Sequence, residues 1–339
     1  MAQAINYFPS QNVSVWYQKE TSVGLQPDDA ALTKLQTISF TIPEGSVPLE
    51  LSSQKSGQFT QTISQAHHSE GTKMWTFDTV LRGTPAAVKL ACEAVFEDGA
   101  SECELSNAYA FPKASYQNAS TASPGTFDIR FEDAGAMDSA NNVVCNGCIG
   151  TGFTLTEDIG SEGGELVCTI NWATGFRPVL GADAITSGAY DTETPKNIRE
   201  LLATSSEIES GNDMVIQSWE LSCNRTIERI HYKDIVSGTF APFGYAMTGG
   251  FEVTGSMTVI RNEDVGELYA IFYNSTAVDI NLANTTSAEF TIALDKCMIN
   301  EPSIDSGGAV LLETIPFTVL GVDDTSGAGT KMLGITITT

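Results

Sequence analysis

The chain has 339 residues, enough for about two domains with a core each. Hydrophobic residues make up 42% and charged residues only 17%, with 30 glycines, a balance that favours many short strands and turns over helices and predicts a mainly β fold. The formal net charge of −25 argues against a protein that grips nucleic-acid phosphates, and it suits either a surface that repels DNA or simple solubility.

Targeting signals are not evident. No segment reaches the roughly 18 apolar residues of a membrane span, and the first residues lack the basic and apolar regions of a signal peptide. Seven cysteines are scattered without a disulfide framework, which favours free thiols in a reducing compartment. We therefore expect a protein that is made in the cytoplasm.

The first half of the chain predicts a series of short strands. Within 73–83, Trp75, Phe77 and Leu81 share one face with polar residues between them, the period of two that marks a half-buried strand. A polar excursion at 55–71 precedes this strand. Looser alternation predicts three earlier strands, within 13–24, 32–42 and 48–54.

The clearest helix prediction covers residues 84–99. Thr84 suits the N-cap, Pro85 suits the first helical position, and Gly99 suits the end of the helix. Apolar residues at positions i, i+3, i+4 and i+7 form a stripe that should face the core. The stripe consists of Val88, Ala91, Cys92 and Val95.

Three more strands are expected before the middle of the chain, at 127–133, 148–158 and 165–175, the last two joined around Gly163–Gly164. Residues 178–213 then lose periodicity, apart from a brief helix that can begin at Thr194–Pro195. We place the domain boundary in this segment. The predicted division is a first domain at 1–177, a linker or decoration at 178–213 and a second domain at 214–339.

The second half predicts a strand, a long polar excursion, a second strand and a short helix between Met214 and Ile280. One face of the first strand holds Val215, Trp219, Leu221 and Cys223, and one face of the second holds Phe251, Val253, Met257 and Val259. Further strands are expected at 290–296, within 307–321 and at 331–339.

This order of elements repeats that of the first half. The unit at 214–274 corresponds to 48–99, the strand at 290–296 to that at 127–133, and 307–321 to 163–175. We infer an internal duplication, with two unrelated β-rich domains as the alternative. The excursion at 224–249 is too long for a tight turn and too polar for a core, so it is predicted to be a projecting arm of the kind that carries function.

Few residues suit catalysis. The three histidines lie in polar excursions, and no G-x-S-x-G turn accompanies a serine. The C-x-x-C at Cys145–Cys148 lacks the second pair of ligands that structural zinc needs and leads into a strand rather than a redox helix. Cys92 and Cys103 can approach each other, but free buried thiols are the expectation. We predict no catalytic residues, no metal and no cofactor, although 42 acidic residues leave a glycosidase-type carboxylate pair open.

Several stretches resemble a known family. They are VWYQKETSVG (15–24), GTFDIRFED (125–133), CNGCIGTGFTLTEDIGSEGGELVCTINWATG (145–175), WELSCNRTIERIHY (219–232), GGFEVTGSMTVIRNEDVGELYAIFYN (249–274) and the closing FTVLG and GITITT. Together they span nearly the whole chain. In this pattern of strands, glycines and one helix per half, the chain resembles the major tail tube proteins of long-tailed, siphovirus-type bacteriophages, in their duplicated two-domain form.

The resemblance implies two tandem β-sandwich or barrel-like domains, each with a flanking helix. Subunits of that family form stacked rings whose inner sheets join into one barrel around a channel. The channel holds the tape-measure protein and conducts DNA during genome ejection. A two-domain chain then implies homotrimeric rings with pseudo-sixfold symmetry, hexamers being the alternative.

The resemblance also implies a location in the virion tail, contact with tail terminator and tail-tip proteins, and DNA that passes without specific binding. The excursions at 55–71 and 224–249 become arms that reach a neighbouring subunit or the next ring. The residues expected to make these contacts are Lys55, Phe59, His67, His68, Arg225, Arg229, His231, Tyr232, Phe243 and Tyr245.

Two other functions remain open from the sequence. One is a carbohydrate- or receptor-binding double β-sandwich, which loops containing Trp and Tyr can serve. The other is a β-rich carbohydrate-active enzyme that uses a carboxylate pair. The shortage of groups suited to catalysis favours assembly or binding over an enzyme.

Overall fold

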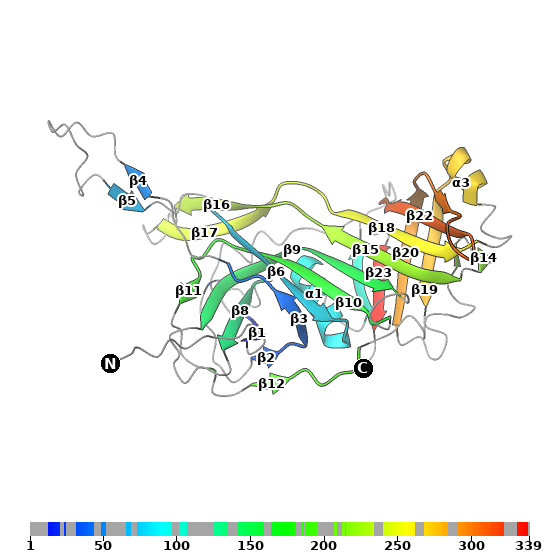
Figure 1. Ribbon diagram of the computed structural model, residues 1–339. Coiled ribbons are helices and arrows are strands. Elements are labelled where there is room, and N and C mark those ends of the chain that lie inside the picture. The colour runs from blue at the N-terminus through cyan, green and yellow to red at the C-terminus, as the bar shows by residue number, and fades with distance from the viewer. Residues whose placement is uncertain are drawn as a thin grey trace.

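The computed structural model describes most of the chain and shows a mainly β protein with two helices in the part described (Figure 1). Among the described residues, no helix is both long enough and apolar enough to cross a membrane. The description covers residues 13–20, 24, 32–43, 49–51, 66–68, 73–96, 102–106, 125–133, 142–158, 164–180, 185, 188–195, 207–208, 212–213, 215–233, 240–261, 268–283, 290–321 and 331–337.

The first half contains ten strands before the middle segment and one helix within the described residues. They are β1 (Val13–Lys19), β2 (Thr33–Lys34), β3 (Thr37–Phe40), β4 (Leu49–Leu51), β5 (Ala66–His68), β6 (Trp75–Arg82), α1 (Pro85–Phe96), β7 (Glu102–Ser106), β8 (Phe127–Asp133), β9 (Val143–Asp158) and β10 (Val167–Thr174).

The middle segment and second half continue in the same style. They contain β11 (Val179–Leu180), β12 (Ala189–Tyr190), β13 (Glu207–Ile208), β14 (Asn212–Asp213), β15 (Ile216–Asn224), β16 (Ile227–Lys233), β17 (Phe240–Met247), β18 (Glu252–Ile260), α3 (Leu268–Asn274), β19 (Val278–Ala283), β20 (Phe290–Ile299), β21 (Ser303–Asp305), β22 (Leu312–Val319) and β23 (Lys331–Ile337).

The predicted order of strand, arm, strand and helix is present in both halves. In the first half, β3 and β6 pair in antiparallel fashion, the β4/β5 hairpin lies between them in the chain, and α1 follows. In the second half, β15 and β18 pair likewise, with the β16/β17 hairpin between them and α3 after them. Both hairpins lie at the same end of the molecule (Figure 1). The strand predicted at 48–54 therefore belongs to the arm, as β4, while β3 takes its place in the main sheet.

Helix α1 forms as its sequence predicts. The Thr84 hydroxyl accepts a hydrogen bond from the Ala87 backbone N–H (3.2 Å), the N-cap contact, and the whole apolar stripe is buried. The helix is described as far as Phe96. Gly99, the residue predicted to end it, lies outside the described residues. A second acceptor at this terminus is Glu193, whose carboxylate accepts from the Ala86 N–H (2.7 Å).

The segment predicted as linker or decoration contributes to the sheets. Strand β11 pairs with β9, β12 runs parallel to β2, and β13 pairs with β19 of the second half. The ring of Tyr190 lies 5.6 Å from that of Trp16 in β1. The described part of 178–213 is thus packed against both halves. A brief helix was predicted to begin at Thr194–Pro195. These two residues do not lie in a helix, and residues 196–206 are outside the description.

One burial prediction from the strand period was wrong, and one strand buries charged residues. Val215 is exposed because β15 contains a register shift between Ile216 and Ser218, which turns Ile216 into the core instead. On β8, Asp128 and Arg130 are buried although they alternate with the core residues. They form an ion pair with each other (2.8 Å). This pairing offsets part of the desolvation cost of burying the two charges.

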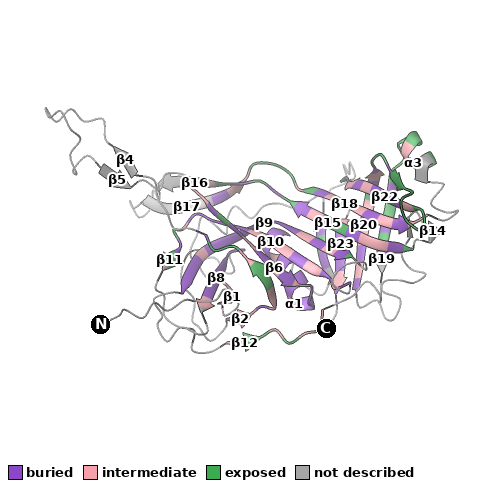
Figure 2. Cartoon of the chain, in the orientation of Figure 1, coloured by how far each residue is buried: buried purple, intermediate pink, exposed green. Residues whose placement is uncertain are grey.

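The two halves share strands as well as a core. β9 pairs with β15, and β7 of the first half pairs with β23 of the second. One hydrophobic cluster contains α1, the inward faces of both halves and the aromatic group around Trp172. In Figure 2 buried residues accordingly recur along the strands of both halves, from the β8/β9 region to the β20/β22 region. The halves are joined along hydrogen-bonded strands.

Candidate assembly surface

One sheet crosses the molecule from the first half to the second. Its strands, in spatial order, are β3, β6, β10 and β9 of the first half, then β15, β18, β22 and β21 of the second. All neighbouring pairs are antiparallel. Alternate residues of these strands enter the core, and the others form a second, half-exposed face.

The half-exposed face is rich in hydroxyl and amide groups. Residues directly opposite each other on paired strands share a face, and hydroxyl pairs cross the sheet at Thr154 and Ser222 (2.9 Å) and at Thr258 and Thr314 (3.3 Å). One continuous row across six strands contains Val80, Thr169, Thr154, Ser222, Thr254 and Thr318. A second contains Asp78, Asn171, Gly152, Asn224 and Glu252.

The charge on this polar face is negative. Asp78, Asp158, Glu220 and Glu252 belong to its rows. Arg82 is the cation of the same rows, and its guanidinium pairs with both carboxylate oxygens of Glu165 (2.6 and 3.1 Å). The described charges of these rows therefore sum to a negative value.

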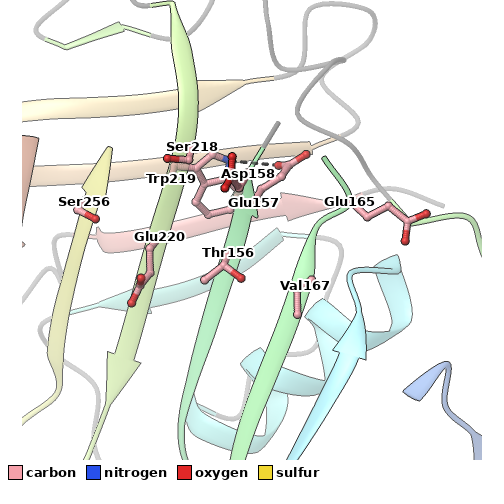
Figure 3. A pocket seen from close by; sticks show the side chains of 9 residues that line it. All are labelled: Thr156, Glu157, Asp158, Glu165, Val167, Ser218, Trp219, Glu220 and Ser256. Carbon is pink, nitrogen blue, oxygen red and sulfur yellow. Dashed lines mark hydrogen bonds between the residues drawn. The ribbon is translucent and has the colours of Figure 1, made fainter. Parts of the chain in front are cut away.

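A cavity of about 260 Å³ opens where the two halves join, between β10, β9, β15 and β18 (Figure 3). Its lining includes the carboxylates of Glu157, Asp158, Glu165 and Glu220. The aromatic residue of the lining, Trp219, is buried, and its indole N–H donates to Glu157 (3.1 Å). A small, polar and acidic hollow differs from the larger, mainly apolar pockets that usually hold small ligands.

The outer edges of β3 and β21 are open in the part of the chain that the structure describes. There, β3 pairs with β6 alone and β21 pairs with β22 alone. The rest of the second end is covered, because β22 also pairs with β20. Exposed apolar side chains lie at these edges: Ile38 and Ile42 at β3, and Ile304 in β21. An exposed strand edge with apolar side chains is a template for pairing with another chain.

The β16/β17 arm is fixed at its base to the first half. The buried guanidinium of Arg225 donates from Nε to the Gly150 carbonyl (3.0 Å) and from Nη2 to the Ala94 carbonyl (2.9 Å) in the last turn of α1. A cation suits this position because carbonyls at a helix C-terminus carry partial negative charge. Arg229 Nη1 adds a bond to the Lys73 carbonyl (3.1 Å).

Tyr245 fixes the other strand of the arm. Its hydroxyl donates to the Gly147 carbonyl (2.7 Å) and accepts from the Gly175 N–H (2.8 Å), while its ring packs with Ile149, Ala173 and Ile227. Burial raises the pKa of Tyr245, so its hydroxyl keeps the proton that it donates.

Gly147 also links Tyr245 to a buried acid, Glu20. The Gly147 N–H donates to Glu20 Oε1 (2.7 Å), and Oε2 accepts from the Gly24 N–H (2.9 Å) and the Thr126 hydroxyl (2.7 Å). Gly147 has φ of 61°, and a Cβ there would lie 2.4 Å from the Phe176 ring, so only glycine suits the position. Glu20, the Gly147 peptide and Tyr245 thus form one hydrogen-bonded series.

Burial dominates the protonation of Glu20. The side chain is almost fully buried, and this raises its pKa from 4.5 to about 7, against the opposing effect of the three donated hydrogen bonds. A folded-state pKa above the unfolded one means that the folded protein binds the proton more tightly. The resulting stabilisation is complete below about pH 4.5 and is lost as the pH rises through about 7.

Replacing Glu20 by Gln should remove this pH dependence. We expect the unfolding free energy of the wild type, relative to Glu20→Gln, to fall by about 3 kcal/mol between pH 4.5 and 7.5, since one pKa unit corresponds to about 1.4 kcal/mol. Urea denaturation of both proteins at several pH values measures this difference in unfolding free energy. Glu93→Gln, at a partly buried ion pair with Lys19, is the control and should leave this pH dependence in place. A constant difference between wild type and Glu20→Gln would contradict the prediction.

The C-x-x-C motif has a structural role. Between Cys145 and Cys148 the pairing of β9 with β8 shifts register, and Gly147 lies in this irregularity. All seven cysteines are buried and none lies in a disulfide, and burial raises the pKa of Cys148 well above its usual value. Within the described residues, no group of three or more potential metal ligands is present.

The residues predicted for the arms divide into three groups. Arg225, Arg229 and Tyr245 come together at the base of the second arm and contact the first half of their own chain. Of the others, the structure gives the strand but not the side-chain contacts for His67, His68, His231, Tyr232 and Phe243, in β5, β16 and β17. Lys55 and Phe59 lie outside the described residues.

Sequence reasoning missed Glu20, Gly147 and the two edge isoleucines, Ile42 and Ile304. Glu20 follows a strand in the position of an ordinary surface acid, and only the fold shows that Thr126 and Gly147 enclose it. The comparisons with known proteins add no family to this geometry: no protein-family model matches the chain, and no curated protein sequence matches it either.

Proposed function

We propose that this protein is a structural subunit of a bacteriophage tail tube, which polymerises into stacked rings around a channel. The observation that carries the proposal is the continuous sheet of eight strands, which is polar and acidic on one face, covered by the core on the other, and open along the outer edges of β3 and β21. Such a sheet satisfies its edges by closing with other copies into a barrel.

The dimensions of a closed barrel suit this role. Neighbouring strands lie about 4.8 Å apart, so sheets from three chains give a circumference of roughly 115 Å and a backbone diameter of roughly 40 Å before strand tilt widens it. That width admits a DNA duplex or an extended tape-measure protein. The proposed lumen is the polar face, where Asp78, Asp158, Glu220 and Glu252 repel phosphates and favour passage without specific binding.

The resemblance to tail tube proteins supplies the proposed partners. Copies of the same chain form homotrimeric rings with pseudo-sixfold symmetry, six chains per ring being the alternative, and the rings stack into the tail of the virion. The tape-measure protein occupies the lumen, and tail terminator and tail-tip proteins close the ends. The role is structural rather than catalytic.

The carbohydrate-binding alternative receives less support from the site. Sugar recognition by a sandwich commonly uses an aromatic ring that a ligand can stack on, and the ring of Trp219 beside the cavity lies in the core, 6.4 Å from that of Phe290. A glycan array would revive this alternative by showing specific binding that Glu220→Gln removes.

Negative-stain electron microscopy of the purified protein tests the proposal. We expect rings or tubes with a stain-filled channel, and class averages with threefold symmetry and six similar lobes. Light scattering across a concentration series should show mass increasing with concentration. A monodisperse monomer at the highest concentration would count against a tube subunit. Class averages with exact sixfold symmetry, one chain per lobe, would favour six chains per ring.

A further inference from the structure

The two halves of the sheet repeat the same strand pairing down to single residues. In the first half, Leu155, Cys168, Leu81 and Thr37 lie opposite one another across β9, β10, β6 and β3. In the second half, Ile304, Glu313, Val259 and Ile216 lie opposite one another across β21, β22, β18 and β15. The two rows fix which residues correspond.

A shared irregularity supports this correspondence. The register shifts between Thr37 and Ser39 where β3 pairs with β6, and between Ile216 and Ser218 where β15 pairs with β18. The shift thus falls at equivalent positions in both halves, directly after the residue of the common row. Counting onward from Thr37 and Ile216, Ile42 occupies the position of Leu221.

The junction between the halves shows how two such units join. Here β9, the last strand of the first unit, pairs with β15, the first strand of the second, and Leu155 lies opposite Leu221. These two leucines are 0% and 1% exposed. Their counterparts at the two open edges are Ile304 and Ile42, which are 46% and 39% exposed. Within one chain, Leu155 and Leu221 bury each other at the junction, whereas their counterparts Ile304 and Ile42 stay exposed at opposite edges of the sheet.

We propose that β21 of one copy pairs in antiparallel fashion with the β3 edge of a second copy, in the register that places Ile304 opposite Ile42. The inference rests on the proposed assembly and specifies its strand-to-strand interface. The same register places Asp305 opposite Thr41, at the positions of Thr156 and Glu220 in the internal junction. The contact is head to tail, because the two edges differ, and its repetition closes a ring.

Engineered cysteines test this register. Directly opposite residues of paired strands have Cα atoms about 4.5–5.5 Å apart, within the range that a disulfide spans. We expect the Ile42→Cys, Ile304→Cys double variant to form covalent multimers under mild oxidation, ending at the size of the closed ring on non-reducing gels. The seven native cysteines are buried, and each single variant should remain uncrosslinked beyond the wild-type level.

The matched control is the Ile38→Cys, Ile304→Cys double variant. Ile38 lies on the same edge and is 50% exposed, but it is four residues from position 42, roughly 13 Å along a strand. We expect no ladder from it. Rings in the microscope without a crosslink between positions 42 and 304, or with an equal crosslink from position 38, would overturn the register while leaving the proposed function standing. A monomer in all conditions would overturn both.

A charge at the edge gives a second test that does not depend on disulfide chemistry. Lysine on an edge strand blocks pairing with another chain. Because Ile304 is exposed in the single chain, we expect Ile304→Lys to lose assembly with an unchanged thermal unfolding midpoint. Val310→Lys, at a residue that is 50% exposed in the adjoining loop, should assemble as the wild type does. Normal tubes from Ile304→Lys would overturn the proposed interface.

Discussion

Residues 214–339 expressed alone will not form a cooperatively folded domain. The second half takes β7 from the first half as the neighbour of β23, with Leu105 opposite Leu333 and Cys103 opposite Ile335, all of them 0% exposed. It also takes β9 as the neighbour of β15. The fragment loses both strands and uncovers part of a shared core, which should leave a broad thermal transition and binding of a dye for exposed apolar surface.

The measurement is circular dichroism during heating, combined with dye fluorescence, on the fragment and the full chain. A matched control carries residues 102–106 fused to the fragment through a flexible linker, which should recover part of the cooperativity. A sharp transition and native near-ultraviolet spectrum from residues 214–339 alone would show that the predicted domain boundary is also a folding boundary.

Arg225→Ala should lower the unfolding free energy by about 2–5 kcal/mol. The side chain is 5% exposed and satisfies two buried carbonyls, those of Gly150 and Ala94. Leaving each without a partner costs about 1–3 kcal/mol. Because Arg225 joins the arm, β9 and α1, the loss should also release the arm base and weaken assembly.

Chemical denaturation followed by tryptophan fluorescence measures the effect of Arg225→Ala. Arg229→Ala is the matched comparison. This arginine donates from Nη1 to the Lys73 carbonyl but is only half-buried, so we expect its loss to cost less than that of the buried Arg225. Arg225→Lys should recover little, because a single ammonium does not reproduce the two directed donors of the guanidinium. Equal midpoints for Arg225→Ala and Arg229→Ala would contradict the role of Arg225.

The parts of the fold that follow from local chemistry were predictable. Helix α1 forms where Thr84 and Pro85 begin it, and the alternation of Trp75, Phe77 and Leu81 places β6 correctly. Val215 was misplaced because the register shift in β15 has no signature in the sequence. A period-two pattern predicts a face only as long as the strand remains regular.

The candidate site depends on contacts that no local pattern contains. Asp128 and Arg130 alternate like surface residues, yet both are buried in an ion pair. The acid that meets Gly147 is Glu20, more than 100 residues earlier in the chain. The arm at 224–249 was predicted as a projection from its length and polarity, but Arg225 and Tyr245 at its base bind the first half. Long-range packing decides these roles.

The pairing of β7 with β23 can form only late in synthesis, because the two strands lie far apart in the chain. About 225 residues separate Ser106 from Lys331, so at about 5–20 residues per second the ribosome needs roughly 10–45 s to supply the partner of β7. The β3 edge is made early, whereas β21 is held in place only after β22 emerges. A growing chain therefore offers one half of the proposed contact long before the other. We expect two growing chains on one polysome to make this contact with each other only after β22 of one of them has emerged.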